Sequence, residues 1–242
     1  MSFGPAATCA WLFVVMACAA CNSAPAPADE GAPTVDAPAS PAPGPRDEDG
    51  VAPARRIVIL GDSLTAGLGL PADEAYPALL QARLDVRNAG WRILNAGVSG
   101  DTSAGGLRRV DWSLDGGAAI VVVALGGNDA LRGLPVADLA RNLDEAVRRA
   151  QDGGARVVIA GMEAPPNTGP EYTAAFRAVY PAIATRRGAT LVPFLLDGVA
   201  GVEALNQADG IHPNQAGARK VAETVWRALE PVVRELEAAP TR

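Results

Sequence analysis

The chain has few of the residues that most often carry covalent or metal chemistry. Its 242 residues include three cysteines, all among the first 21, and a single histidine, His212. The rest of the chain therefore offers no disulfide, no cysteine ligands for zinc and no catalytic thiol. One histidine also excludes the usual two- and three-histidine metal sites, so we expect no metal. Covalent catalysis would need another nucleophile, and a histidine base could only be His212.

Positive charge is also scarce. Lys220 is the only lysine among 21 cationic residues, and 27 acidic residues bring the formal net charge to −6. Because a phosphate backbone is bound by a basic face, we expect no nucleic-acid partner. The chain is 49% hydrophobic and 20% charged, which predicts a full core and one globular domain, or at most two.

Residues 1–28 carry no charged side chain and include an apolar run over 10–20. That run has the length of a signal-peptide core and is too short to span a bilayer. Cys21 follows two alanines and precedes a polar segment, which resembles a bacterial lipoprotein signal with a lipidated cysteine. Cys18 is the alternative lipidation site, and a simply cleaved signal is the alternative to the anchor. We expect an exported protein, periplasmic or at the cell surface, held to the membrane by lipid.

The chain divides into three segments by composition. Residues 1–21 are the expected export signal. Residues 22–56 hold eight of the 20 prolines and nine alanines without apolar periodicity, which predicts a disordered tether. Residues 57–242 form the expected folded domain.

The expected domain alternates short aliphatic runs with longer amphipathic segments. The runs, each typical of a buried parallel strand, are 57–60, 91–94, 119–125, 157–160 and 190–192. A helix is predicted after Pro135, ending at Gly153. Two more are expected near 172–183 and 213–237, with a kink or break at Pro181 and a bend or interruption at Pro231. Five strands alternating with helices predict an α/β/α sandwich around a parallel sheet.

Four polar clusters follow strands or precede the last helix, where ligands bind in such sheets. They are 61–65, 95–102, 126–129 and 208–214. Each cluster alone is typical of turns and helix caps. Together they supply what acyl transfer needs. Ser63 is a nucleophile, His212 its base, and Asp209 an acceptor that fixes the histidine tautomer. The Gly100 backbone, the Asn128 amide and the Ser63 N–H are candidate oxyanion donors.

These blocks resemble the SGNH (GDSL-type) hydrolases over essentially all of 57–242. Within that superfamily they are most similar to the bacterial thioesterase I, arylesterase and lysophospholipase group. The resemblance implies a flavodoxin-like fold with five parallel strands and a serine esterase without a cofactor, acting on aryl or acyl esters, thioesters or lysophospholipids. It assigns Ser63, Asp209 and His212 to the triad, and Gly100 and Asn128 to the oxyanion hole.

The loop after the fourth strand is expected to contact the acyl chain, through Met162, Ala164 and Pro165. The resemblance implies a larger aliphatic residue at position 164, so we expect Ala164 to admit bulkier groups. The arginine pairs at 108–109, 148–149 and 186–187 are predicted to lie on solvated helix faces, and Arg132 is the arginine expected near substrate.

Three alternatives remain open from the sequence. A carbohydrate O-acetyl esterase can use the same scaffold. A catalytically silent, surface-anchored binding module would keep the fold without the chemistry. A nucleotide or flavin carrier would rest on fold analogy alone.

Overall fold

The computed structural model describes residues 55–87 and 90–239. The expected signal, the lipidation candidates Cys18 and Cys21, and the tether up to residue 54 lie outside these residues. The first strand opens at Arg56, one residue before the expected start of the domain.

Five parallel strands form one sheet in the order β2-β1-β3-β4-β5. Their bounds are β1 Arg56–Gly61, β2 Arg92–Gly97, β3 Ile120–Ala124, β4 Arg156–Ala160 and β5 Thr190–Val192. Each expected aliphatic run is confirmed as a strand, although β2 starts one residue later and continues to Gly97. The side chains of β3 and of 57–60 in β1 are buried on both sides, because helices cover both faces of the sheet.

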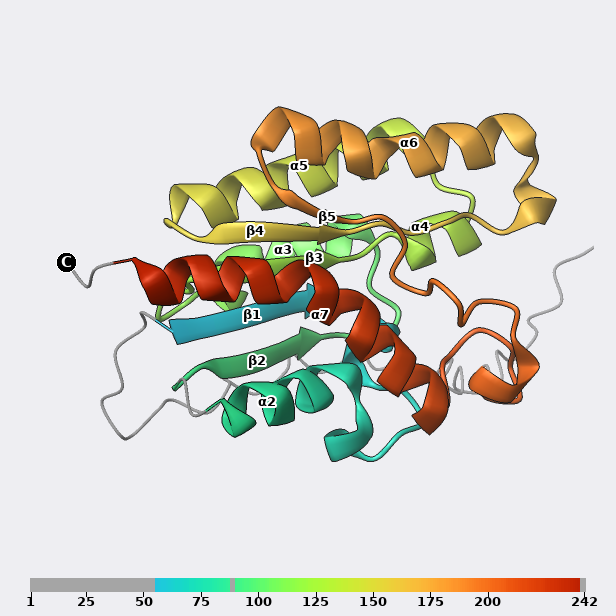
Figure 1. Ribbon diagram of the computed structural model, residues 1–242. Coiled ribbons are helices and arrows are strands. Elements are labelled where there is room, and N and C mark those ends of the chain that lie inside the picture. Colours follow the sequence, from blue (N-terminus) through green and yellow to red (C-terminus); the bar gives the residue numbers. More distant parts are fainter. Residues whose placement is uncertain (1–54, 88–89, 240–242) are drawn as a thin grey trace, which may run out of the picture. The chain divides into compact units, whose positions relative to one another are not determined.

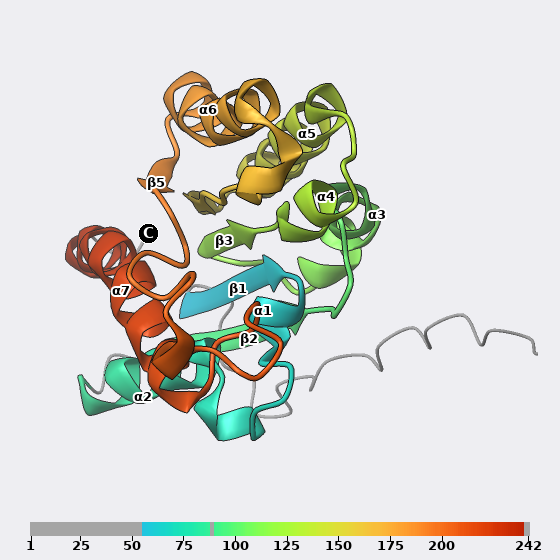
Figure 2. The same cartoon turned by 90° about the vertical axis from the view of Figure 1, so that its right-hand side faces the viewer.

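The helices complete a three-layer α/β/α sandwich. Their bounds are α1 Ser63–Ala66, α2 Tyr76–Val86, α3 Ser103–Ser113, α4 Gly127–Leu131, α5 Val136–Asp152, α6 Pro170–Arg187 and α7 Gln215–Ala238, with short 3₁₀ turns η2 Ala72–Glu74, η3 Pro166–Thr168 and η4 Glu203–Leu205. Figures 1 and 2 show α2 and α7 on one face of the sheet and α3 and α5 on the other. The strand order is that of flavodoxin-like folds, as expected.

Both internal prolines lie within helices that continue through them, so neither helix is interrupted, and a local kink or bend at these prolines stays a prediction. Pro181 lies inside α6 and Pro231 inside α7. A proline removes one backbone hydrogen bond from a helix interior. Buried neighbours such as Val179 and Ile183 hold the turns on either side against the core, and this packing outweighs the local defect.

Among the described residues no helix is long and apolar enough to cross a membrane.

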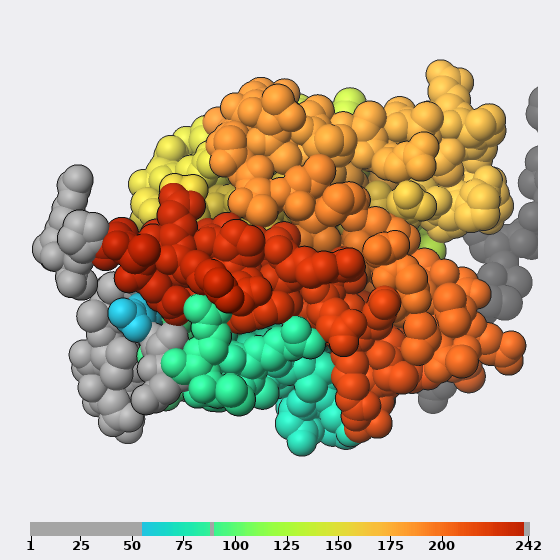
Figure 3. Space-filling view, in the orientation of Figure 1, coloured from blue at the N-terminus to red at the C-terminus, as the bar shows by residue number. Residues whose placement is uncertain are grey.

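The C-terminal helix α7 packs along α2, and the space-filling view shows the two in contact over much of their length (Figure 3). Polar contacts fix the far end of this pair. Glu237 accepts hydrogen bonds from Arg87, at 2.9 Å, and from the indole of Trp91, at 3.0 Å. The helix that follows the His212 loop is thereby tied to the first half of the domain.

The short helix α1 is held tightly against the end of β2. The side chain of Asn95 donates to the Thr65 carbonyl oxygen at 2.9 Å. A Cβ built on Gly97 would lie 2.3 Å from the backbone nitrogen of Ala66. Only glycine therefore allows the strand to come this close to α1, whose first residue is Ser63.

We expect Gly97→Ala to lower the free energy of unfolding by about 1–3 kcal/mol, because the new methyl meets backbone atoms that move only if α1 moves. Urea denaturation measures the change. Gly153→Ala is the matched control, since its Cβ would meet its nearest atom, the Ala150 oxygen, at 3.4 Å with an ordinary φ of −74°. Equal stability of the two variants would contradict the steric argument.

Candidate active site

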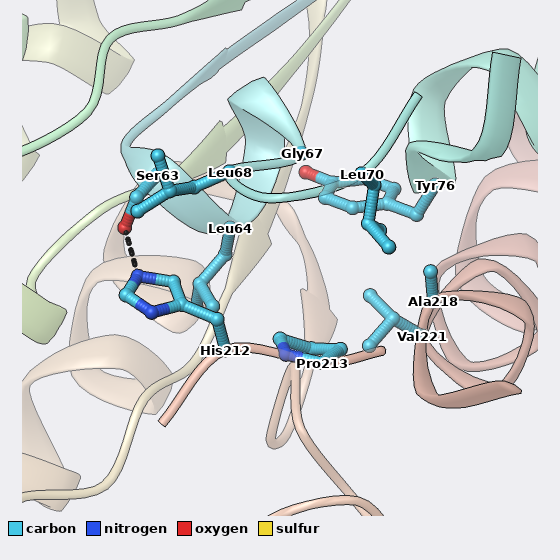
Figure 4. Close-up of a pocket in the computed structure, with 10 residues that line it drawn as sticks. All are labelled: Ser63, Leu64, Gly67, Leu68, Leu70, Tyr76, His212, Pro213, Ala218 and Val221. Carbon is cyan, nitrogen blue, oxygen red and sulfur yellow. Dashed lines mark hydrogen bonds between the residues drawn. The ribbon is translucent and has the colours of Figure 1, made fainter. Parts of the chain in front are cut away.

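Three side chains from two segments far apart in the sequence form a continuous hydrogen-bonded relay. Ser63 begins α1 at the end of β1, and His212 lies in the loop before α7. The Ser63 Oγ lies 2.9 Å from His212 Nε2, and His212 Nδ1 lies 2.7 Å from Asp209 Oδ2 (Figure 4 shows the first contact). The predicted nucleophile, base and orienting carboxylate are therefore brought together in the order that acyl transfer requires.

Asp209 is fixed by its own loop. Its Oδ1 accepts the backbone N–H groups of Ile211 and His212, at 2.9 and 3.0 Å. These backbone bonds, together with the His212 side chain, lower the pKa of Asp209 to about 2. The carboxylate is thus ionised throughout the neutral range, where it holds the Nδ1–H tautomer of the imidazole and leaves Nε2 free to accept a proton from Ser63.

The oxyanion donors expected from the sequence are linked through Asn128, whose amide contacts Asp62 and Asp101, the chain neighbours of Ser63 and Gly100. Gly100 adopts a φ of +83°, and no hydrogen-bond acceptor among residues 55–87 and 90–239 pairs with its N–H or with that of Ser63. Asn128, in the first turn of α4, donates its amide to the Asp101 carbonyl oxygen at 3.0 Å and faces Asp62 Oδ2 at a longer 3.4 Å. Two open backbone donors suit a developing oxyanion, and the Asn128 amide would join them by exchanging its longer bond, to Asp62, for one to the oxyanion.

Asp62 directly precedes the nucleophile Ser63, and its contact with Asn128 was not anticipated from the sequence. It caps α1, because its Oδ1 accepts the Leu64 N–H at 3.0 Å, while Oδ2 faces the Asn128 amide. The side chain is buried, and this desolvation raises the pKa of Asp62 to about 6. Asp62 therefore links the start of α1 to an oxyanion donor at the cost of burying a charge.

We expect Asp62 to make folding less favourable as its carboxyl ionises. Because the pKa of Asp62 is about 6 in the folded chain and ordinarily 3.8, the folded state holds the proton more tightly. The contribution of Asp62 to the free energy of unfolding therefore falls by about 3 kcal/mol as the pH rises from about 4 to about 6. Above about pH 6 this contribution no longer changes with pH.

Urea denaturation of the wild type and of Asp62→Asn across pH 4–8 measures this contribution as the difference between the two proteins. The wild type should lose stability relative to the variant over that window. A difference that does not change with pH would show that Asp62 does not titrate there.

Arg109 is not on a solvated helix face, which corrects the sequence-based expectation. It extends from α3 to the carboxyl ends of two strands, where it donates to the carbonyl oxygens of Gly61, at 2.7 Å, and Ala96, at 2.6 Å. Its Nε also binds the Asp101 carboxylate at 2.6 Å, and its side chain is only 14% exposed. One guanidinium thus joins the strand before Ser63 to the loop that carries Gly100.

Gln207 was also missed, and it connects the base loop to the nucleophile loop. Its amide donates to the carbonyl oxygens of Leu68, at 2.7 Å, and Pro213, at 3.0 Å. Its backbone N–H donates to the carbonyl oxygen of His212 at 2.7 Å. The His212 loop is therefore fastened directly to the segment that follows α1. A polar residue two positions before Asp209 was the only sequence signal.

A small pocket opens beside the relay and is largely apolar (Figure 4). It is lined by Ser63, Leu64, Gly67, Leu68, Leu70, Tyr76, His212, Pro213, Ala218 and Val221. The residues expected to contact an acyl chain do not line this pocket. Met162 and Ala164 are buried, Pro165 is half-buried, and the Met162 side chain packs against Gly127, next to Asn128. The loop after β4 thus borders the oxyanion side of the site.

Within the part of the chain that the structure describes, no group of three or more His, Cys, Asp or Glu side chains is arranged to hold a metal ion. The chemistry that the site itself supports is nucleophilic attack by Ser63 on a carbonyl carbon, with proton transfer through His212.

Comparison with known proteins gives the same picture. A model of the GDSL-like lipase/acylhydrolase family matches residues 59–220. The chain is 45% identical to an esterase, TesA, of Pseudomonas aeruginosa over 183 residues, which cover 75% of this chain and 91% of that protein. It is 35% identical to the thioesterase 1/protease 1/lysophospholipase L1 of Escherichia coli K12, over 75% of this chain and 86% of that protein. The crystal structure of the esterase EstA from Pseudoalteromonas sp., inhibited by monoethylphosphonate, superposes with a TM-score of 0.71 at 33% identity, over 74% of this chain and 99% of that structure.

Proposed function

This chain belongs to the GDSL-like lipase/acylhydrolase family, and we propose that it hydrolyses carboxylic esters with Ser63 as nucleophile, His212 as base and Asp209 as the orienting carboxylate. It is a serine esterase of the SGNH type. The observation that carries the residue assignment is the unbroken relay, with contacts of 2.9 Å and 2.7 Å, from Ser63 through His212 to Asp209.

The geometry supports a two-step reaction. Ser63 Oγ attacks the ester carbonyl while His212 Nε2 takes its proton, and the N–H groups of Ser63 and Gly100 with the Asn128 amide stabilise the oxyanion. The imidazolium then gives its proton to the departing alcohol, which leaves an acyl group on Ser63. Water, activated by His212, attacks this acyl-enzyme and releases the acid and the free serine.

The substrates we propose are aryl and acyl esters, and by the names of the relatives also thioesters or lysophospholipids. The largely apolar pocket beside Ser63 supports hydrophobic substrate groups. A carbohydrate O-acetyl esterase and a silent binding module are the alternatives that the following experiment separates.

The experiment measures kcat/KM for p-nitrophenyl esters of increasing acyl length, with the full chain and with Ser63→Ala as background. We expect activity that exceeds the background and rises beyond acetate. An optimum at acetate, with preference for acetylated sugars, would favour the carbohydrate esterase. No activity at any length, and no labelling of Ser63 by a fluorophosphonate, would favour the binding module.

We expect Ala164→Leu to shift the ester preference towards shorter or slimmer acyl groups. Ala164 is buried in the loop after β4, whose Met162 packs against Gly127, and a larger side chain at 164 should push this loop into the space next to Asn128. The ratio of kcat/KM for octanoate to that for butanoate should fall about tenfold, which is the discrimination that one or two methylenes provide in an apolar pocket. Leu131→Ala, at an exposed aliphatic residue of α4, is a control for nonspecific loss. An unchanged octanoate-to-butanoate ratio would remove Ala164 from the acyl site.

For the segment outside the described residues we propose export and a lipid anchor at Cys21, which would place the enzyme in the periplasm or at the cell surface. The apolar run before Cys21 supports the lipid anchor. The net charge of −6 argues against a nucleic-acid partner. Detergent two-phase partitioning of the full chain against Cys21→Ala tests the anchor. Equal partitioning of both into the aqueous phase would contradict it.

A further inference from the structure

Arg132 lies at the edge of the oxyanion hole. It follows α4 directly, one helical turn after Asn128, and its backbone N–H donates to the Asn128 carbonyl oxygen at 3.1 Å. Its guanidinium crosses to the loop after β2, where one N–H group donates to the Gly100 carbonyl oxygen at 2.8 Å. Arg132 therefore contacts the segments of both oxyanion residues, while its side chain stays exposed to solvent.

The charge of Arg132 has no acidic partner among residues 55–87 and 90–239, since no carboxylate lies within 4 Å of it. The acidic groups close to the site are engaged elsewhere. Asp101 pairs with Arg109 at 2.6 Å, and Asp209 pairs with His212 at 2.7 Å. In a chain with a net charge of −6, where most arginines of the described residues form ion pairs, an unneutralised cation in contact with Gly100 is unusual.

We propose that Arg132 recognises an anionic group, a carboxylate or a phosphate, carried by the ester substrate. A guanidinium presents five N–H donors in a planar fork that fits two oxygens of such groups. One N–H group of the Arg132 guanidinium donates to the Gly100 carbonyl oxygen, which holds the guanidinium against the loop after β2. The other N–H groups of the guanidinium are left for a ligand. The proposal rests on the esterase function and adds the class of substrate that the site prefers.

A different role for Arg132 makes a different prediction. If the guanidinium only held Gly100 in place, its loss would weaken oxyanion stabilisation for every ester and would lower kcat irrespective of substrate charge. If it binds a substrate anion, its loss raises KM for charged esters alone. Pairs of substrates that differ only in charge therefore separate the two roles.

The experiment compares the full chain with Arg132→Gln and Arg132→Lys on two matched pairs. One pair places the charge on the acyl end, with p-nitrophenyl octanoate and the mono-p-nitrophenyl ester of octanedioic acid. The other places a phosphate on the leaving group, with 1-hexanoylglycerol and 1-hexanoylglycerol 3-phosphate. Arg108→Gln is the control, because Arg108 is also exposed and has no ion pair among the described residues.

We expect Arg132→Gln to raise KM for the charged member of at least one pair by about tenfold, with the neutral members within about twofold and kcat retained. Arg132→Lys should recover part of the loss, because it keeps the charge but not the fork. The pair that responds identifies whether the anion lies on the acyl or the alcohol side. Equal losses on neutral and charged esters, or no loss on either charged ester, would overturn the inference. Failure of the esterase function itself would appear separately, as wild-type rates no higher than those of Ser63→Ala on the neutral esters.

Discussion

Replacing His212 with glutamine is expected to lower kcat by about 10⁴-fold or more, with little change in KM. His212 is the only imidazole in the chain, so no other histidine can take the Ser63 proton. Glutamine keeps a side chain of similar length that can still hydrogen-bond, but it cannot accept and return a proton at neutral pH. Steady-state hydrolysis of a neutral p-nitrophenyl ester measures the loss.

The double variant gives this prediction its sharpest form. Ser63→Ala and His212→Gln should each remove about the same activity, and the two together should remove no more, because residues of one relay act as a unit. Asp209→Asn should cost less than either. Thermal unfolding of each variant controls for misfolding. Activity of His212→Gln above about 1% of wild type would point to a base other than His212.

Replacing Arg109 with methionine is the second change with a large expected effect. The side chain is mostly buried, so its loss removes the guanidinium donors of the Asp101 carboxylate and of the Ala96 carbonyl oxygen, and leaves the Gly61 carbonyl oxygen with the Val98 N–H alone. Removing one partner of a buried ion pair typically costs about 3–5 kcal/mol. For a domain of this size we expect the melting temperature to fall by about 10 °C or more.

We expect Arg109 to act on catalysis as well, as a positioning residue for the Gly100 loop, because its guanidinium binds Asp101, the next residue. Its loss should lower kcat more than it raises KM, because the proposed role of Gly100 is to stabilise the transition state rather than the bound ester. Arg109→Lys should retain part of the stability but not the three-way contact. Arg108→Met, at the exposed neighbouring position, is the matched control and should change neither quantity. A full-rate Arg109→Met enzyme at a temperature where it remains folded would leave Arg109 with a structural role only.

The parts of this molecule that the sequence predicts are those encoded over short stretches. The five aliphatic strands were found because each is a continuous buried run, and the Asp209–His212 pair because the two residues are three positions apart. The contacts of Arg109 could not be found in this way. Its backbone partners lie 13 and 48 residues away, and an arginine on a helix is usually solvated. Pro181 and Pro231 leave their helices uninterrupted for a similar reason, because tertiary packing outweighs a local helix defect.

The burial of Asp62 is another feature that contacts distant in the sequence determine. Its position before Ser63 marks it as a helix cap, which the structure confirms. Its low solvent exposure depends on Asn128, 66 residues away, and on the layers that close over both. A pKa near 6 follows from that environment rather than from any local pattern.

The spacing of the relay has a consequence for how activity is acquired during folding. Asp209 and His212 are joined by contacts confined to one loop, and the base with its carboxylate can form as soon as that loop closes. Ser63 lies 149 residues from His212, and Gln207 is the side chain that fastens their two segments together. We therefore expect the docking of the His212 loop onto the segment after α1 to complete the active site late in folding. During refolding, the return of hydrolysis should then lag behind the circular-dichroism signal of helices and sheet, and simultaneous recovery of the two would contradict this order.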